Sequence, residues 1–373
     1  MSLRLPPYID RFLLWLVATV ALASVLPPLG RGAVVVDGLA DAGIALLFFL
    51  HGAKLSRQAI LQGVGHWRLH LLVLASTYVL FPLLGLATAG LAGGRVDPWL
   101  VSGLLYLTLL PSTVQSSIAF TAMARGNVAA AVCSASLSNL LGIVVTPLLV
   151  TLLLHLDAGA SGSVAAPMRA IAVQLLLPFV AGHLLRPAIG RWVDRHKVVL
   201  QPIDRGAILL VVFSAFSAAV AAGLWSRIGI GDLALLLGAS AMILAIVLGV
   251  NAGVARLARL VREDAVVLLF CGSKKSLVSG VPMAGALFDP AHVGTVVLPL
   301  MIFHQLQLMV CATLAGRMAR RVEADGAVPK SEAAMQAAAA KTGLPIPPAC
   351  REGVLANLAL LERHAAALRG DAR

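Results

Sequence analysis

Long apolar runs, separated by short clusters of charge, glycine and proline, leave few folds open to this chain. A membrane-spanning helix needs roughly 20 mostly apolar residues. Ten runs are long enough, and they cover about 11–29, 34–53, 67–93, 97–124, 128–155, 166–186, 204–226, 232–258, 263–288 and 291–317. The composition agrees, because 59% of the residues are hydrophobic and 12% charged, with a mean hydropathy of +0.92. The sequence therefore predicts an all-α membrane protein with ten transmembrane helices.

The same pattern argues against other classes of protein. The first apolar run has no small-residue cleavage site, so we interpret it as a spanning helix. The net charge of +12 lies in clusters between apolar runs and only 5% of the residues are aromatic, so we expect membrane lipids and no nucleic acid as partners. The four cysteines lack CxxC spacing and are interpreted as free thiols. No hydrolase, metal or ATP-binding motif is present, which predicts a non-enzyme without a cofactor.

Basic residues concentrate in alternate loops and set the orientation. The N-terminus, every second loop and the C-terminal flank carry most of the lysines and arginines, whereas the other loops carry only Arg31, Arg95, Arg169 and Arg227. Cytoplasmic loops hold the excess of basic residues in membrane proteins. Both termini are therefore predicted to be cytoplasmic, in a multi-pass protein of the cell inner membrane.

The fourth and ninth predicted helices are interrupted by small polar residues at LPSTVQSSIAF (110–120) and CGSKKSLVSG (271–280). Five helices per half is an odd number, so a second copy of the half enters the membrane with opposite orientation. This predicts two inverted repeats, about 8–155 and 166–318, in a transporter domain of 1–321. Interrupted helices at matching positions of such repeats indicate a binding site near the bilayer midplane. The alternative is that the small residues only let neighbouring helices pack closely.

The interruptions and the polar residues of neighbouring helices supply the candidate site. Two lysines inside a membrane helix are costly, which makes a functional role the first hypothesis. The alternative is that both extend along their stems to water. In the tenth helix, a histidine is interpreted either as a proton carrier or as a packing contact between helices. The candidate solute and ion site comprises Ser112, Thr113, Gln115, Ser116, Ser117, Asn139, Ser273, Lys274, Lys275, Ser276, His304 and Gln305.

Three segments resemble the bile acid:sodium symporter family, most closely its bacterial sodium-dependent transporter-like subgroup. They are FFLHGAKLS in the second helix, LLPSTVQSSIAFTAMARGNVAAA across the fourth and fifth, and GSKKSLVSGVPMAGALF in the ninth, and the similarity covers about residues 8–320. The resemblance implies a six-helix core with two crossed, discontinuous helices (4 and 9), packed against a four-helix panel. It assigns helices 3–5 and 8–10 to the core and places the solute between core and panel.

The sequence departs from the sodium-coupled members at the residues that would enclose sodium. Ser116 and Ser117 stand where the family has Ser-Asn, Phe270 or Cys271 stands at the position of a Glu, and Lys274-Lys275 replace Gln-Asn. An ammonium group offers no lone pair to a metal ion. At an effective dielectric of 20, two cations about 4 Å apart repel by roughly 4 kcal/mol. Sodium coupling is therefore doubtful.

One lysine is expected to replace the missing cation, capped by Ser116, Ser117 and helix-end carbonyls, and the other to face the cavity and attract an anion. A buried lysine can also exchange its proton, so both Na⁺ and H⁺ stay open as the coupling ion. We predict a secondary active transporter of an organic, anionic solute that works by alternating access. The alternative is a non-transporting regulator of ion homeostasis or a scaffold on the same fold. The sequence also leaves a homodimer open.

The tail, 322–373, changes character and is predicted to be cytoplasmic and helical. A serine precedes the Ala-rich run in PKSEAAMQAAAAKTG, as in a helix cap. Val354, Leu358, Leu361, Ala365 and Leu368 then share one helix face. The segment LPIPPACREGVLANLALLERHAAALRG resembles small wrapping subunits of amidases, which would give the tail a cytoplasmic partner. An amphipathic helix on the membrane or on the chain itself is the alternative.

Overall fold

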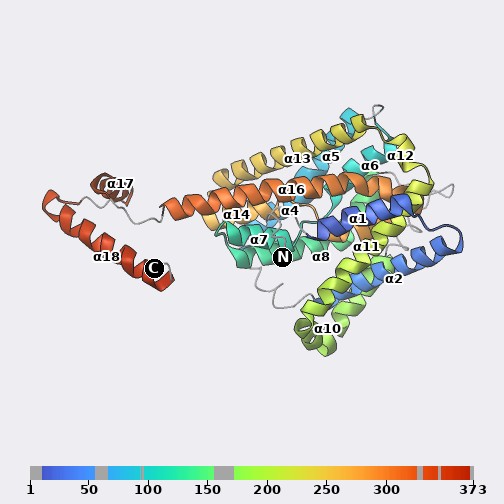
Figure 1. Cartoon of the computed structure of the whole chain (residues 1–373), viewed down its shortest axis with the longest axis horizontal. Helices are drawn as coiled ribbons and strands as arrows, with labels where there is room; N and C mark the ends of the chain where they lie inside the picture. The colour runs from blue at the N-terminus through green and yellow to red at the C-terminus, as the bar shows by residue number, and fades with distance from the viewer. Residues whose placement is uncertain are drawn as a thin grey trace. The chain divides into compact units, whose positions relative to one another are not determined.

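The computed structural model describes residues 11–54, 66–92, 94, 96–154, 172–325, 331–342 and 346–369. The chain divides into two compact units, Met1–Gly316 and Arg317–Arg373. Every regular element among the described residues is a helix, as Figure 1 shows. The prediction of an all-α fold is confirmed.

The first group of helices precedes the first interruption. Gly30 has a φ of 56° in the turn between the first two helices, a left-handed conformation that costs glycine little. Further along, a π-helical turn lies inside a continuous stretch from Trp67 to Ala92. The elements are α1 (Arg11–Val25), α2 (Arg31–Lys54), α4 (Trp67–Ala75), η2 (Ser76–Leu80) and α5 (Phe81–Ala92).

The fourth predicted helix is two helices, α6 (Pro98–Leu109) and α7 (Gln115–Met123). Pro98 occupies the first turn of α6, and the Asp97 side chain caps it by accepting from the Trp99 amide at 2.8 Å. The helix ends where the backbone becomes extended at Leu110, before a proline. The interruption therefore lies where the small polar residues predicted it.

The remaining helices of the first unit follow in the order of the sequence. The ninth predicted helix is also divided, into α14 and α15, and the Ser276 hydroxyl caps the second piece by accepting from the Ser279 amide. The elements are α8 (Val128–Leu153), η3 (Ala172–Leu176), α10 (Leu177–Arg195), α11 (Lys197–Ala221), α12 (Leu224–Arg227), α13 (Ile230–Leu257), α14 (Arg262–Cys271), α15 (Leu277–Leu287) and α16 (Pro290–Asp325).

Some predicted helix boundaries are wrong. We expected helices to end at 186 and 317 and one to begin at 204, whereas α10 continues to Arg195, α16 to Asp325, and α11 begins at Lys197. The apolar runs end at clusters of charge, but a helix continues past the apolar run because charged side chains are acceptable in a helix outside the hydrocarbon region. The predicted boundaries at 155 and 166 lie outside the described residues.

Seven helical stretches within the described ranges are long and apolar enough to cross a membrane. Three shorter apolar helices, Leu14–Val25, Pro98–Leu109 and Leu277–Leu287, account for the difference from ten. The last two are halves of the interrupted helices, and the first belongs to the segment whose beginning lies outside the described residues. The protein is therefore a polytopic helical membrane protein with two discontinuous helices.

The helices of the first unit contact one another in two groups. In one group α2 packs along α10 and α11, and α1 packs on α11. In the other, α4, α5, α6, α7, α8, α13 and α14 pack together. Helix α15 contacts α2 and α11 of the first group and α8 of the second. Glycines permit the closest approach, because a Cβ on Gly182 of α10 would lie 2.0 Å from the Phe49 carbonyl oxygen of α2.

The second unit includes α17 (Glu332–Thr342), η4 (Pro348–Cys350) and α18 (Arg351–Arg369). The Ser331 hydroxyl caps α17 by accepting from the Ala334 amide at 3.2 Å, so the expected serine cap is present. Arg351 and Glu332 form an ion pair at 3.0 Å between the two helices, and Met335 is buried.

Candidate functional site

The two interruptions lie against each other and satisfy each other's backbone. The Ser276 amide donates to the Pro111 carbonyl at 2.9 Å, and the Ser112 hydroxyl donates to the Cys271 carbonyl at 2.6 Å. The Tyr106 hydroxyl donates to the Gly280 carbonyl at 2.6 Å. Unwound backbone inside a membrane protein needs such partners because lipid offers none.

Side chains of α8 hold the first interruption in place. The Ser138 hydroxyl accepts from the Ser112 amide at 3.0 Å, and the Asn139 amide group donates to the Ser112 carbonyl at 2.6 Å. The Asn139 side-chain oxygen in turn accepts from the Ser279 hydroxyl at 2.9 Å, which links α8 to α15. Asn139 thus connects both interruptions.

Gln307 of α16 holds the second interruption. Its amide group donates to the Lys275 carbonyl at 2.9 Å, and its oxygen accepts from the Lys275 amide at 2.8 Å. The Gln307 side chain thus satisfies both backbone groups of Lys275, which lies outside the helices. The Gln307 amide nitrogen also lies 2.9 Å from Nδ1 of His304.

The ammonium group of Lys275 is enclosed by backbone carbonyls. The residue is fully buried, and its Nζ donates to the carbonyl oxygens of Thr77, Thr108 and Leu110 at 2.8, 2.7 and 2.7 Å. Two of these carbonyls lie at the C-terminal end of α6, where the helix dipole is negative. The Phe81 ring lies 4.1 Å from the ammonium. All three ammonium hydrogens therefore have acceptors.

Lys274 is equally buried but has a different environment. Its Nζ has no hydrogen-bond partner among the described residues. It lies 4.2 Å from the centre of the Phe120 ring and 5.6 Å from that of Phe270. The thiols of Cys271 and Cys311 are the other titratable groups that interact with it. The two adjacent lysines thus differ in how their charge is stabilised.

These positions differ from the arrangement expected from the sequence. The carbonyls of α6 and η2 receive the Lys275 ammonium, whereas Ser116 and Ser117 do not. Lys274 is fully buried, so the structure does not place it on the cavity surface. Neither lysine reaches water, because both side chains have 0% exposure.

The residues at the crossing do not fit a sodium ion at the position that the resemblance implies. Sodium requires oxygen ligands, and three carbonyl oxygens at the crossing are bonded to Lys275. A second cation about 4 Å away would be repelled by roughly 4 kcal/mol at an effective dielectric of 20.

A cavity of about 620 Å³ opens beside the crossing, a volume typical of sites for small organic molecules. Polar residues of the interrupted helices, α8 and α16 contribute to the lining, as do apolar residues of α2, α10, α11 and α15. The polar residues include Thr113, Gln115, Ser116, Ser136, Asn139, Ser276, Ser279 and His304. The apolar residues, or apolar wall, include Leu47, Phe48, Phe179, Ile208, Pro282 and Met283.

Charged and polar residues of α2 and α11 also line the cavity. Lys54 and Asp204 form an ion pair, and His51 and Gln201 lie in the same lining. Arg205 belongs to this lining as well, with its guanidinium 5.5 Å from the Phe12 ring. Basic groups thus exceed the single acidic group of the lining.

The candidate residues from the sequence fall into two layers. Thr113, Gln115, Ser116, Asn139, Ser276 and His304 line the cavity. Ser112, Ser117, Ser273, Lys274 and Lys275 are buried at the crossing. Gln305 is not in the cavity lining, and its side-chain oxygen is buried without a partner among the described residues.

Sequence reasoning missed other residues of the site. Gln307 was not among the candidate residues, and the carbonyls of Thr77 and Thr108 carry no side-chain signal at all. Gln201 and Asp204 were not among the candidates, because Gln201 lay outside the helix expected over 204–226 and Asp204 was its first residue. The π-helical turn that presents Thr77 has no obvious pattern in the sequence.

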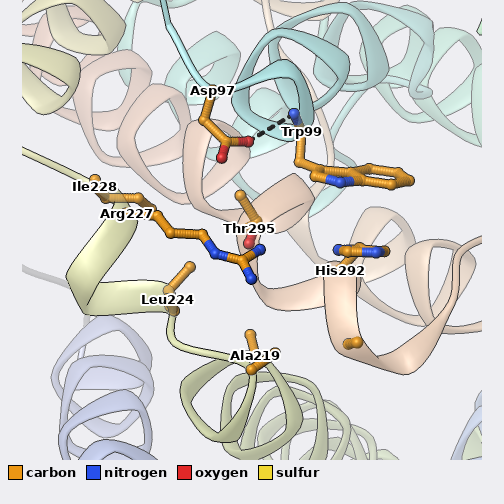
Figure 2. Close-up of a pocket in the computed structure, with 10 residues that line it drawn as sticks. Asp97, Trp99, Ala219, Leu224, Arg227, Ile228, His292 and Thr295 are labelled. Atoms are coloured by element: carbon orange, nitrogen blue, oxygen red, sulfur yellow. Dashed lines mark hydrogen bonds between the residues drawn. The ribbon is translucent and has the colours of Figure 1, made fainter.

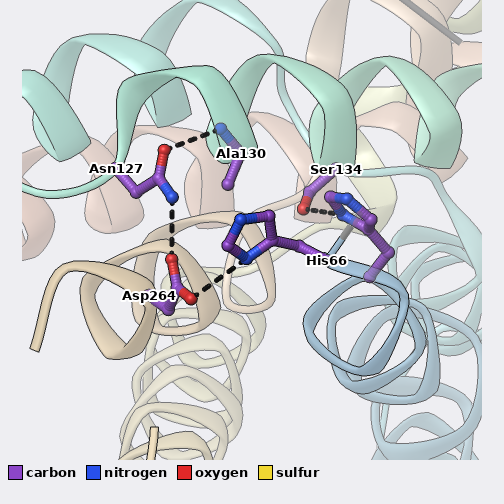
Figure 3. Close-up of polar contacts among 6 residues, drawn as sticks. His66, Asn127, Ala130, Ser134 and Asp264 are labelled. Carbon is purple, nitrogen blue, oxygen red and sulfur yellow. Dashed lines mark hydrogen bonds and ion pairs between the residues drawn. The ribbon is translucent and has the colours of Figure 1, made fainter. Parts of the chain in front are cut away.

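Polar contacts hold the first turn of α14 in place (Figure 3). The Asp264 carboxylate accepts from the Asn127 amide at 2.9 Å and lies 3.3 Å from Nδ1 of His66. Asn127 also caps α8 by accepting from the Ala130 amide at 3.0 Å. The first turns of α8 and α14 are therefore joined beside the two interrupted helices.

A second polar cluster lies between the N-terminal ends of α6 and α16 and the turn at α12 (Figure 2). The Trp99 ring stacks on the His292 ring at 3.8 Å, with an interplanar angle of 11°. Figure 2 shows the Arg227 guanidinium between the side chains of Asp97 and Thr295 and those of α11 and α12. The void that remains there measures about 10 Å³, enough for one water at most.

Two discontinuous helices that cross beside a large cavity, in a protein with many apolar helices, define a membrane transporter fold. Comparison with known proteins agrees. The profile of the SBF-like CPA transporter family matches residues 10–320, and the chain belongs to this family. The resemblance to bile acid:sodium symporters is confirmed.

Several relatives show how far the similarity extends. The chain is 54% identical over 315 residues to the putative symporter YfeH of Escherichia coli, a match that covers 84% of this chain and 94% of the relative. It is 56% identical over 324 residues to the protein PA2026 of Pseudomonas aeruginosa, covering 87% and 97%. It is 29% identical over 284 residues to sodium/bile acid cotransporter 7 of Rattus norvegicus, covering 73% and 80%. The protein is a multi-pass membrane protein of a transporter family.

Proposed function

We propose that this protein is a secondary active transporter that moves an organic anion across the cell inner membrane by alternating access. The observation that carries the proposal is the 620 Å³ cavity, which is lined by residues of both interruptions and by helices of the other group. A solute in this cavity would contact the two parts that must move against each other. The family membership and the symporter names of relatives support the class of function.

The architecture that we propose has ten crossings in two inverted repeats. The two groups of contacting helices support a division into a core, which holds the interrupted helices, and a panel of α1, α2, α10 and α11. The meeting of the interruptions supports a site near the midplane. The concentration of basic residues in alternate loops supports a cytoplasmic location for both termini.

The charge of the cavity favours an anion. Lys54 and Arg205 accompany one carboxylate, Asp204, whose charge is already matched by Lys54. Arg205 is the strongest candidate to bind the solute, because guanidinium groups form paired hydrogen bonds with carboxylates and other oxyanions. The apolar wall would hold the hydrocarbon part of the solute.

The coupling that we propose does not use sodium at the crossing. Lys275 places an ammonium group among the carbonyls, so binding the solute would need no sodium ion there. The names of the rat and other vertebrate relatives refer to sodium. We propose that this chain differs from them in needing no sodium ion at the crossing.

A ligand screen tests the proposal. Purified protein is heated with a panel of organic anions, in sodium and in choline buffers, and a ligand that binds raises the unfolding temperature. We expect carboxylate or sulfonate compounds with an apolar body to stabilise the protein in both buffers. Arg205→Gln should weaken their binding by about tenfold, the usual scale for a lost charged hydrogen bond, whereas Arg256→Gln, at an exposed position outside the cavity lining, should not. Stabilisation by organic cations alone would contradict the proposal.

A further inference from the structure

Lys274 poses a problem that Lys275 does not. Both side chains are fully buried, yet only Lys275 has carbonyl acceptors for its ammonium group. The Nζ atom of Lys274 meets two aromatic faces, with no hydrogen-bond partner among the described residues. Aromatic faces stabilise an ammonium ion only in part, and they also tolerate a neutral amine. Lys274 is thus a buried group that can exist with or without its proton.

A chain of hydroxyl groups leads from the cavity toward Lys274. Ser116 and Thr113 line the cavity, and their hydroxyl oxygens lie 2.9 Å apart. The Thr113 oxygen lies 3.1 Å from the hydroxyl oxygen of Ser117, which is fully buried. The Ser117 hydroxyl donates to the carbonyl of Phe270 at 3.2 Å, and the ring of Phe270 flanks Lys274. A hydroxyl group both donates and accepts, so such a chain can pass protons in either direction.

The elements around Lys274 contribute few titratable groups. Helix α14 contributes the Cys271 thiol, which is hydrogen-bonded with Ser117. Helix α16 contributes the Cys311 thiol, which is hydrogen-bonded with Ser273. Helix α7 contributes Phe120, and Lys275 is the adjacent cation. No carboxylate is among the groups that interact electrostatically with Lys274, so the described surroundings supply no fixed negative partner that would keep it charged.

We propose that Lys274 is the proton-binding site of this transporter, loaded from the cavity through Ser116, Thr113 and Ser117. A hydronium ion in the cavity gives a proton to the first hydroxyl, and each hydroxyl passes its own proton onward as far as Ser117. The Ser117 hydroxyl bonds to the Phe270 carbonyl in this structure, so the last transfer requires the Lys274 side chain to turn toward Ser117, where its neutral amine takes the proton. The products are a water molecule and an ammonium ion, so atoms and charge balance. The proposal rests on the transport function proposed above, since it assigns the coupling ion of that function, but it is tested without any solute.

The test measures charge movement in proteoliposomes adsorbed on a solid-supported electrode. A rapid change of external pH, with no organic solute present, should produce a transient current in the parent protein as Lys274 gains or loses a proton. Lys274→Gln removes the proton site, and Lys274→Arg makes its charge permanent, so both should lose the transient current. Each variant is first checked for a parent-like elution profile and unfolding temperature in detergent.

The hydroxyl chain is tested with a matched pair of variants. Thr113→Val should slow the decay of the current by about tenfold, because a proton relay loses its central member. Thr88→Val is the control, because Thr88 has the same exposed fraction of 6% and its hydroxyl donates to the Leu84 and Gly85 carbonyls of its own helix, α5. It should leave the current unchanged.

Separate outcomes concern the proton site and the transport proposal. A parent current that Lys274→Gln and Lys274→Arg both retain would overturn the proton site, as would the absence of any current in the parent. A Lys274-dependent current in a protein that moves no solute would support the proton site and contradict the transport proposal. Solute uptake without a Lys274-dependent current would support the transport proposal and contradict the proton site.

Discussion

At the scale of single residues, the structure separates two adjacent lysines that look equivalent in the sequence. Lys275 fills the carbonyl acceptors of α6 and η2, whereas Lys274 occupies an aromatic chamber. The first is a structural charge whose removal leaves acceptors unsatisfied. The second is a charge that the surrounding protein does little to stabilise.

This difference predicts opposite effects on stability. Lys275→Met should lower the unfolding temperature strongly, because three buried carbonyls lose a charged donor, at about 1.5–3 kcal/mol for each such bond. Lys274→Met should leave the unfolding temperature unchanged or raise it, because an apolar side chain replaces a buried charge of similar length. Thermal unfolding in detergent measures both variants side by side. The result would count against the assignment if Lys274→Met were the more damaging change.

At the scale of helices, the sequence was most informative about the interruptions. Small polar residues at 110–120 and 271–280 predicted both interruptions. Such residues can supply hydrogen-bond partners to unwound backbone, which lipid cannot. Which carbonyls enclose which lysine was not predictable. Lys275 bonds to Thr77, which lies 198 residues away in the chain, and a carbonyl leaves no trace in the identity of its residue. The sequence also did not show how far some helices continue beyond their apolar runs, because charged helix ends have no apolar signal.

The contact between α2 and α10 gives a prediction about helix packing. Gly182→Ala places a Cβ 2.0 Å from the Phe49 carbonyl oxygen, so the two helices must move apart. Overpacking of this kind costs about 1–3 kcal/mol, and the unfolding temperature should fall. Gly249→Ala in α13 is the matched control, because its Cβ would meet nothing within 4 Å. Equal effects of the two substitutions would show that α2 and α10 do not approach so closely.

At the scale of the whole molecule, the sequence predicted the all-α membrane class and the family, because hydropathy and three motifs are spread over most of the chain. The division into core and panel was implied by the family resemblance alone, and it stays a proposal. The cavity was not visible in the sequence, because its lining combines residues from helices far apart in the chain.

Orientation in the membrane gives a further prediction at this scale. Cys350 is exposed, whereas Cys133, Cys271 and Cys311 are buried, so a membrane-impermeant maleimide has one preferred target. With the C-terminus in the cytoplasm, we expect Cys350 to react only after the cells are permeabilised. A Cys350→Ser variant identifies the labelled site. Reaction of Cys350 in intact cells would invert the predicted topology.

The central claim is that the ammonium of Lys275 replaces the cation that would otherwise be bound where the interrupted helices cross. The most direct measurement is uptake of a solute identified by the ligand screen into proteoliposomes, with sodium replaced completely by choline. The account predicts that the initial rate of uptake stays within about twofold, since no sodium-binding energy is lost from the site. A steep dependence of uptake on sodium in the parent protein would contradict it.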